Sequence, residues 1–171
     1  MNIFYLHSNP TIAAKYHNDK HVVKMILESA QMLSTAHREL DDGNVMNESI
    51  VYKSAHKNHP STKWARASYQ NYRWLYLLFS DLCDEYTHRY GKVHLTDTKL
   101  REVLSIVPRG IDYLPLFTQP PQCMPDEYKV PGDSVSAYRN YYIGEKAHFS
   151  KWTNRDIPNW WSVQNDDNEE E

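Results

Sequence analysis

The stretch Asp19-Lys-His-Val-Val-Lys-Met-Ile-Leu-Glu-Ser-Ala-Gln-Met-Leu-Ser-Thr-Ala-His-Arg38 decides the fold class. It forms most of a pattern, from Ala13 to about Arg38, in which apolar residues surround nearly the whole circumference of a helix. A helix that is apolar on almost every side is normally buried. The sequence therefore predicts a long central helix, which the turn-forming residues 41–44 bring to an end.

Three further segments have helical patterns. Apolar and aromatic residues recur at spacings of three and four between Pro60 and Gly91, and shorter patterns cover residues 97–107 and 134 to about 152. Residues 108–133 hold six of the nine prolines, so we expect an ordered, extended loop there. The predicted fold is mainly α, with four to five helices in one compact domain, residues 1–164, followed by an acidic disordered tail, residues 165–171.

The charge of the chain is unevenly distributed. The formal net charge of its 171 residues is −3, but five of the 22 acids lie in residues 165–171. The other 17 acids face 19 lysines and arginines, so residues 1–164 carry a formal charge of +2 and remain compatible with nucleic-acid binding. Two distant cysteines and the lack of a long apolar run argue against a disulfide scaffold and a membrane protein, and predict a cytoplasmic location.

A mixed polar stripe runs along the predicted central helix. Its members follow one another at spacings of three and four: His17, His21, Lys24, Glu28, Gln31 and Thr35. The stripe is either a solvated face or the lining of a cleft, because burying such groups is costly unless they pair. In a cleft, Lys24 and Glu28 would supply an amine and a base.

Two histidines of this stripe have the i, i+4 spacing of a helical metal pair. A third ligand would have to come from elsewhere, and the possible residues are Asp19, Glu28, His56, His59 and His94. The sequence is not an HExxH motif, and nine histidines make chance pairs common. We therefore predict no metal site and no cofactor, since Gly-rich phosphate loops and zinc-deaminase motifs are also missing from the sequence.

Asn58, His59 and Pro60 precede the second predicted helix. Proline holds His59 extended, so its imidazole and the Asn58 amide would lie at a helix start, where anions bind. The same residues could simply cap the helix. Arg66 and Arg73 extend this region into a possible phosphate-binding edge.

The last predicted helix alternates rings and cations. Tyr138, Tyr141 and Tyr142 lie among Arg139 and Lys146. Such a surface can stack on unpaired bases and bind their phosphates. The alternative is that the rings belong to the core while the cations face solvent.

Several of these segments resemble a family of short proteins encoded by tailed phages. The resemblance rests on residues 2–6 and 19–38, on Lys57-Asn-His-Pro60, and on Met124-Pro-Asp-Glu-Tyr-Lys129 joined to Tyr138-Arg-Asn-Tyr-Tyr-Ile-Gly-Glu-Lys146. It covers the chain to about Trp161 and implies a location in the cytoplasm of the host cell.

The sequence also resembles the pyrimidine-dimer DNA glycosylases of the endonuclease V type. Tyr138–Lys146 is similar to a Trp-Tyr-Lys-Tyr-Tyr-Gly-Lys run of that family, with one residue inserted, and Asn58-His59-Pro60 matches its bacterial members. The resemblance implies a small, all-helical, metal-independent enzyme that uses its N-terminal amine as nucleophile and a glutamate of an early helix. Glu28 matches that glutamate, although the family's flanking arginine is missing. Asn2 should block removal of Met1, which leaves the Met1 amine or a buried Lys24 as nucleophile.

The favoured hypothesis is thus a phage DNA glycosylase and lyase that cleaves the N-glycosidic bond of a damaged or modified nucleotide. Glu28, Lys24, Met1 and His21 would be catalytic. DNA would be bound by His17, Asn58, His59, Arg66, Arg73, Tyr138, Arg139, Tyr141, Tyr142 and Lys146. Two alternatives remain: an enzyme acting on free nucleotides or nucleosides, and a non-catalytic phage protein that binds a host protein through the aromatic helix.

Overall fold

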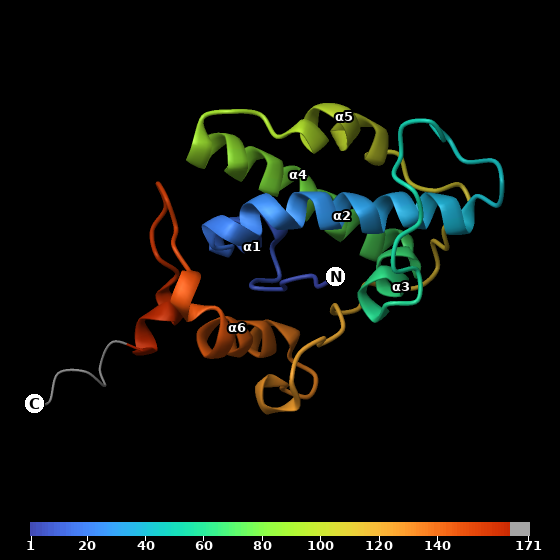
Figure 1. Ribbon diagram of the computed structural model, residues 1–171. Helices are drawn as coiled ribbons and strands as arrows, with labels where there is room; N and C mark the ends of the chain where they lie inside the picture. The colour runs from blue at the N-terminus through green and yellow to red at the C-terminus, as the bar shows by residue number, and fades with distance from the viewer. Residues whose placement is uncertain (165–171) are drawn as a thin grey trace, which may run out of the picture.

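The computed structural model describes residues 1–164, in which every regular element is a helix (Figure 1). The α-helices are α1 (Pro10–Tyr16), α2 (Asp19–Leu40), α3 (Pro60–Arg66), α4 (Tyr69–Tyr90), α5 (Leu95–Leu104) and α6 (Ser134–Glu145). The short 3-10 helices are η1 (Asp126–Tyr128), η2 (Ala147–Phe149) and η3 (Asn159–Gln164). The predicted mainly α fold is confirmed, and none of the described helices is long and apolar enough to cross a membrane. The acidic tail predicted at 165–171 lies outside the described residues.

The two long predicted helices are each divided in two, which raises the number of α-helices above the expected four to five. The break after α1 falls at His17, whose ψ of 133° is extended, and the Asn18 side chain then caps α2 by accepting the backbone N–H of His21. Ser68 caps α4 in the same way, through the backbone N–H of Asn71. Asn and Ser are strong N-caps, so each begins a new helix inside a continuous apolar pattern.

The shorter elements also differ from their predicted bounds. α5 begins and ends earlier than predicted, and the segment predicted to continue as a helix to about residue 152 leaves α6 at Glu145 and passes through η2. Gly91 ends α4 with a left-handed φ of 68°, the conformation expected of a helix-terminating glycine.

α2 is the centre of the helical bundle. It packs against α3, α4 and α5, while α1 packs against α4 (Figure 1). Val22, Ile26 and Leu33 of α2 are fully buried. One prediction is wrong here: α2 is not buried on every side, because Val23 and Leu27 are 39% and 41% exposed.

The first six residues form a segment without regular secondary structure that lies between α2 and α6 (Figure 1). Ile3, Phe4, Tyr5 and Leu6 are all buried. The Phe4 ring stacks on His21 of α2 and contacts Tyr138 and Tyr142 of α6. The segment therefore joins α6 to the bundle through apolar contact on both of its sides.

The proline-rich loop, residues 108–133, is ordered through side-chain bonds to its backbone. Trp64 donates its indole N–H to the Thr118 carbonyl, and Tyr138 donates its hydroxyl to the Pro121 carbonyl. Gln122 and the Val130 backbone exchange two hydrogen bonds. These contacts supply partners for loop backbone that regular structure leaves unpaired.

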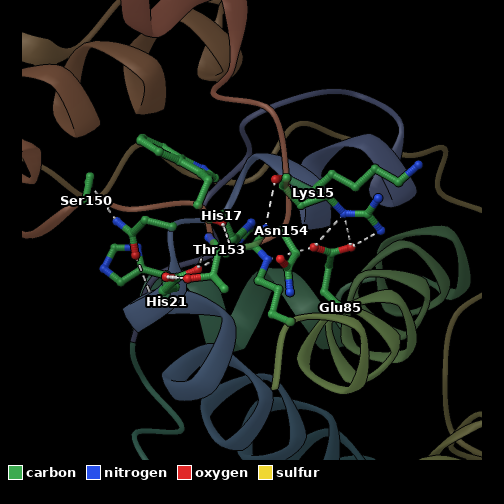
Figure 2. Close-up of polar contacts among 12 residues, drawn as sticks. Lys15, His17, His21, Glu85, Ser150, Thr153 and Asn154 are labelled. Carbon is green, nitrogen blue, oxygen red and sulfur yellow. Dashed lines mark hydrogen bonds and ion pairs between the residues drawn. The ribbon is translucent and has the colours of Figure 1, made fainter. Parts of the chain in front are cut away.

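The C-terminal segment is tied to the start of the chain by a buried ionic network (Figure 2). Glu85 binds both Arg89, at 2.8 Å, and Arg155, at 2.6 Å. Arg89 also donates to the carbonyls of Lys15 and His17, and Asp19 accepts hydrogen bonds from Arg89 and from Thr153. One buried guanidinium thus connects α1, α4 and the start of α2.

Replacing Arg89 by Met should destabilise the fold by about 3–5 kcal/mol, because it removes one partner of a buried ion pair and leaves two carbonyls without a donor. Urea unfolding followed by circular dichroism measures this change. Lys129→Met removes an exposed pair with Asp126 and should leave the unfolding midpoint nearly unchanged. Equal midpoints for the two variants would contradict a role for Arg89 in holding α1 on α4.

Candidate functional site

The N-terminal amine and Glu28 form the centre of the candidate site. The Met1 nitrogen lies 3.4 Å from Glu28 Oε1, and the Met1 and Glu28 side chains are only 3% and 17% exposed. The amine is held there because residues 3–6 are buried immediately behind it. An amine next to a carboxylate that can accept its proton is one arrangement that can activate a nucleophile.

The second Glu28 oxygen is enclosed. Glu28 Oε2 is buried without a hydrogen-bond partner among the described residues, and the Lys24 Nζ lies 3.9 Å from it, beyond hydrogen-bonding distance. The prediction that Lys24 is buried is wrong, because its side chain is 69% exposed. Lys24 points from the outer face of α2 and lacks the desolvation that would activate it as a nucleophile.

His59 belongs to the same region. Its Nδ1 caps α3 by accepting the Ser61 backbone N–H at 3.1 Å, so the capping interpretation of this residue is correct. Burial lowers the pKa of His59, and the positive charges of the N-terminal amine and of His56 lower it further. With Nδ1 as acceptor, the neutral ring carries its proton on Nε2.

The Asn2 side chain ties the N-terminal segment to the proline-rich loop, a contact that the sequence does not predict. Its side-chain amide donates to the Cys123 carbonyl at 3.0 Å, and the Cys123 thiol lies 3.6 Å from the Ser61 hydroxyl. The two bonded residues are 121 positions apart. No local sequence pattern predicts such a contact, because it depends on the proline-rich loop passing next to the N-terminal segment.

His17 and His21 lie in the core. His17 is fully buried and bonds the Ala13 carbonyl through Nδ1, while His21 bonds the Tyr142 hydroxyl at 2.7 Å. Burial lowers the pKa of His17 to about 4 and that of His21 to about 2. The predicted single polar stripe is therefore wrong, because His17 ends α1 and is not on the same helix as the other members.

The residues expected to form a phosphate-binding edge do not lie together in the structure. Asn58 is exposed before α3, and Arg73 is exposed on α4, where it lines an apolar hollow of about 270 Å³ with Trp74. Arg66 is half-buried and donates to the Lys57 carbonyl at 2.7 Å, which ties the preceding turn to α3.

The rings of α6 divide between core and surface. Tyr138 and Tyr142 are fully buried, so the expectation that they form an exposed stacking surface is wrong. Burial raises the pKa of both hydroxyls. Tyr141 remains half-buried, with the Lys146 ammonium 4.8 Å from its ring centre. Arg139 donates to the Leu6 carbonyl and packs over Trp160, and so anchors the N-terminal segment.

The first 99 residues match the family model for pyrimidine dimer DNA glycosylase. The chain belongs to the pyrimidine dimer DNA glycosylase family. The matched part runs from Met1 into α5 and contains both members of the amine–carboxylate pair. Neither the curated proteins nor the solved structures with which the sequence was compared include a match.

Some of the candidate residues lie inside the range that matches the glycosylase family, and others lie outside it. Met1, Lys24, Glu28 and His59 lie inside the matched part, whereas α6 and the C-terminal segment lie outside it. Among the described residues, no group of three or more His, Cys, Asp or Glu side chains is arranged as a metal site.

The two buried histidines should make the fold less stable at acidic pH. In the unfolded chain His17 and His21 titrate near 6.5, whereas in the folded chain their pKa values are about 4 and about 2. Below pH 6.5 the unfolded state therefore binds more protons, and stability falls as the pH drops toward 4. Thermal unfolding at pH 7 and pH 4.5 should show a smaller loss for His21→Gln than for the native chain. Equal losses would contradict a neutral buried His21.

Proposed function

We propose that this protein is a DNA glycosylase and lyase that cleaves the N-glycosidic bond of a damaged or modified nucleotide, with the Met1 amine as nucleophile. The observation that carries the proposal is the 3.4 Å contact between the Met1 nitrogen and Glu28 inside a largely buried site. Membership of the pyrimidine dimer DNA glycosylase family supports DNA as the substrate.

In the proposed reaction Glu28 accepts a proton from the N-terminal ammonium, and the free amine attacks the sugar C1′. A nitrogen–carbon bond forms while the N-glycosidic bond breaks, and the base leaves with the electron pair and takes up a proton. The nitrogen then loses one proton, its electron pair forms the C=N bond as the C1′–O4′ bond breaks, and O4′ takes up a proton, which gives a protonated Schiff base between Met1 and the opened sugar. The Glu28 carboxylate also stabilises the positive charge that develops on the sugar as the base departs.

The surrounding residues would act by positioning. His21 stacks on Phe4 at 4.2 Å between ring centres and thereby fixes the segment that carries the amine. His59, neutral and with its Nε2 proton available, would donate a hydrogen bond to a sugar or phosphate oxygen next to the amine. Such positioning matters because even a small displacement of the nucleophile is costly.

The resemblance to tailed-phage proteins leads us to propose further that the enzyme acts on DNA in the cytoplasm of an infected host cell. The host-protein alternative loses its proposed interface, since Tyr138 and Tyr142 are buried. The Lys146→Glu variant distinguishes a DNA enzyme from an enzyme of free nucleotides. It should reduce activity if the substrate is DNA and leave activity unchanged if the substrate is a free nucleotide.

Borohydride reduction in the presence of DNA with an abasic site or ultraviolet damage should trap a covalent protein–DNA adduct. Glu28→Gln should reduce the rate of trapping by about 10²–10⁴-fold, since it removes the proton acceptor. Lys99→Gln is the matched control, because it alters an exposed amine on α5 that lies over the Tyr52 ring and should change the rate little.

The trapped adduct should map to Met1. Trypsin releases residues 1–15 as one peptide, and mass spectrometry should find the reduced sugar on its N-terminal nitrogen. An adduct on Lys24 would exclude Met1 as nucleophile, and the absence of any adduct would exclude the lyase step.

A further inference from the structure

The loop that follows α5 carries a group of exposed apolar side chains. Leu114 is 90% exposed, Leu116 is 76% exposed and Tyr113 is 59% exposed. We call these three residues the apolar knob. Single exposed leucines are common on protein surfaces, but three large apolar side chains within four residues form a patch, and exposed patches mark interaction sites.

The apolar knob is held in place at both of its ends. Before it, the Asp112 carbonyl accepts the Tyr69 backbone N–H at 2.8 Å, and the Asp112 carboxylate accepts the Leu114 N–H at 3.0 Å. After it, the Phe117 backbone N–H donates to the Gln70 side-chain oxygen at 3.2 Å. An anchored protrusion has little conformational entropy to lose when a partner covers it, which favours binding.

An apolar hollow lies next to the knob. Its volume is about 270 Å³, and it is lined by Tyr69, Gln70, Arg73, Trp74, Leu77 and Phe117. All of these residues except Phe117 belong to α4. Tyr113 of the knob stacks on Tyr69 of the hollow, with the ring centres 4.9 Å apart. The knob and the hollow therefore share one face of the molecule.

The walls of the hollow are supported from the interior of the protein. Trp74 donates its indole N–H to the Ser8 carbonyl at 2.8 Å. The buried Tyr5 ring contacts both Trp74, at 5.0 Å between ring centres, and Phe117, at 6.3 Å. Because these contacts fix the rings from behind, the hollow exists before any partner arrives, as in most binding sites.

This face has the self-complementarity that a two-fold dimer needs. An isologous interface pairs the same patch of two copies, so each copy can place its knob in the hollow of the other. The polar border fits the same arrangement, since Arg73 lines the hollow and Asp112 anchors the knob. Both side chains are exposed and have no ion-pair partner within residues 1–164, which leaves them able to pair across the two-fold axis.

The exposed area is sufficient for a weak dimer. With whole-residue areas of about 200 Å², the three knob residues of one copy expose roughly 400 Å². Two knobs and the walls of two hollows together exceed the roughly 1,000 Å² that separates specific interfaces from incidental contacts. An interface near this lower limit gives a dissociation constant on the order of 10 µM.

We propose that two copies of this chain form a two-fold symmetric dimer in which the apolar knob of each copy occupies the hollow of the other. Neither Met1 nor Glu28 takes part in this contact, so the dimer does not depend on the proposed function. DNA is a poorer occupant of this face, because its phosphates need a cationic surface, whereas the face is apolar with one base and one acid at its border.

The first test is the association state. Sedimentation velocity at protein concentrations of about 1–200 µM should show a monomer–dimer equilibrium for the native chain. The double variant Leu114→Asn, Leu116→Asn should raise the dissociation constant at least about 100-fold, because four leucines per dimer lose their burial. Both leucines are exposed in the monomer, so the variant should keep the native circular dichroism spectrum. A native chain that is monomeric over the whole range would overturn the proposal.

Leu95→Asn is the matched control. Leu95 is 79% exposed, almost the same as Leu116, but it follows the end of α4 that lies opposite the hollow (Figure 1). Its replacement should leave the dissociation constant unchanged. If Leu95→Asn weakens the dimer as much as the double variant does, the knob is not the interface.

The second test locates the contact. Amide NMR spectra of the native chain at increasing concentration should show shifts confined to residues 69–77 and 112–118. Shifts confined to other helices would place the interface elsewhere and contradict the proposal. If the chain instead stays monomeric and the same residues shift when a DNA duplex is added, the face binds DNA and the proposed dimer is wrong.

Discussion

The burial of residues 3–6 between the helical bundle and α6 is the constraint on which the rest of the structure depends. This segment has no regular hydrogen-bonding pattern, and its position is set by ring packing and by Arg139, which donates to the Leu6 carbonyl. Moving the segment would move the amine of Met1 away from Glu28 and separate α6 from α2. The same apolar contacts thus determine both the fold and the geometry of the candidate site, which links that geometry to the stability of the core.

Helical periodicity was sufficient to predict the all-α fold and the order of its elements. It could not predict the division of two long helices, because the apolar pattern continues through Asn18 and Ser68 while their side chains cap new helices. The N-cap preference of Asn and Ser is the sequence signal that marks both breaks. Which face of α2 stays open could not be predicted either, since Val23 and Leu27 look like core residues in the sequence.

The sequence likewise predicts only part of the candidate site. The family resemblance predicts Met1, and together with the polar stripe it predicts Glu28; the fold brings these two residues together. The stripe also predicts Lys24, and the aromatic run predicts Tyr142, but the lysine is exposed and the tyrosine is buried. Residue type predicts what a side chain can do, whereas its exposure depends on packing between distant segments. The Asn2–Cys123 bond is the clearest case of such a distant contact.

The placement of the N-terminal segment has a consequence for the timing of synthesis. Residues 1–6 are made well before α6, but Phe4 packs on Tyr138 and Tyr142 of that helix. The Met1 amine and the Glu28 carboxylate therefore lie in a part of the chain whose final position waits for α6. Domains form cooperatively once their distant contacts are complete, so the growing chain would carry this amine without the contacts that position it. The Met1–Glu28 pair would form only after α6 has been made.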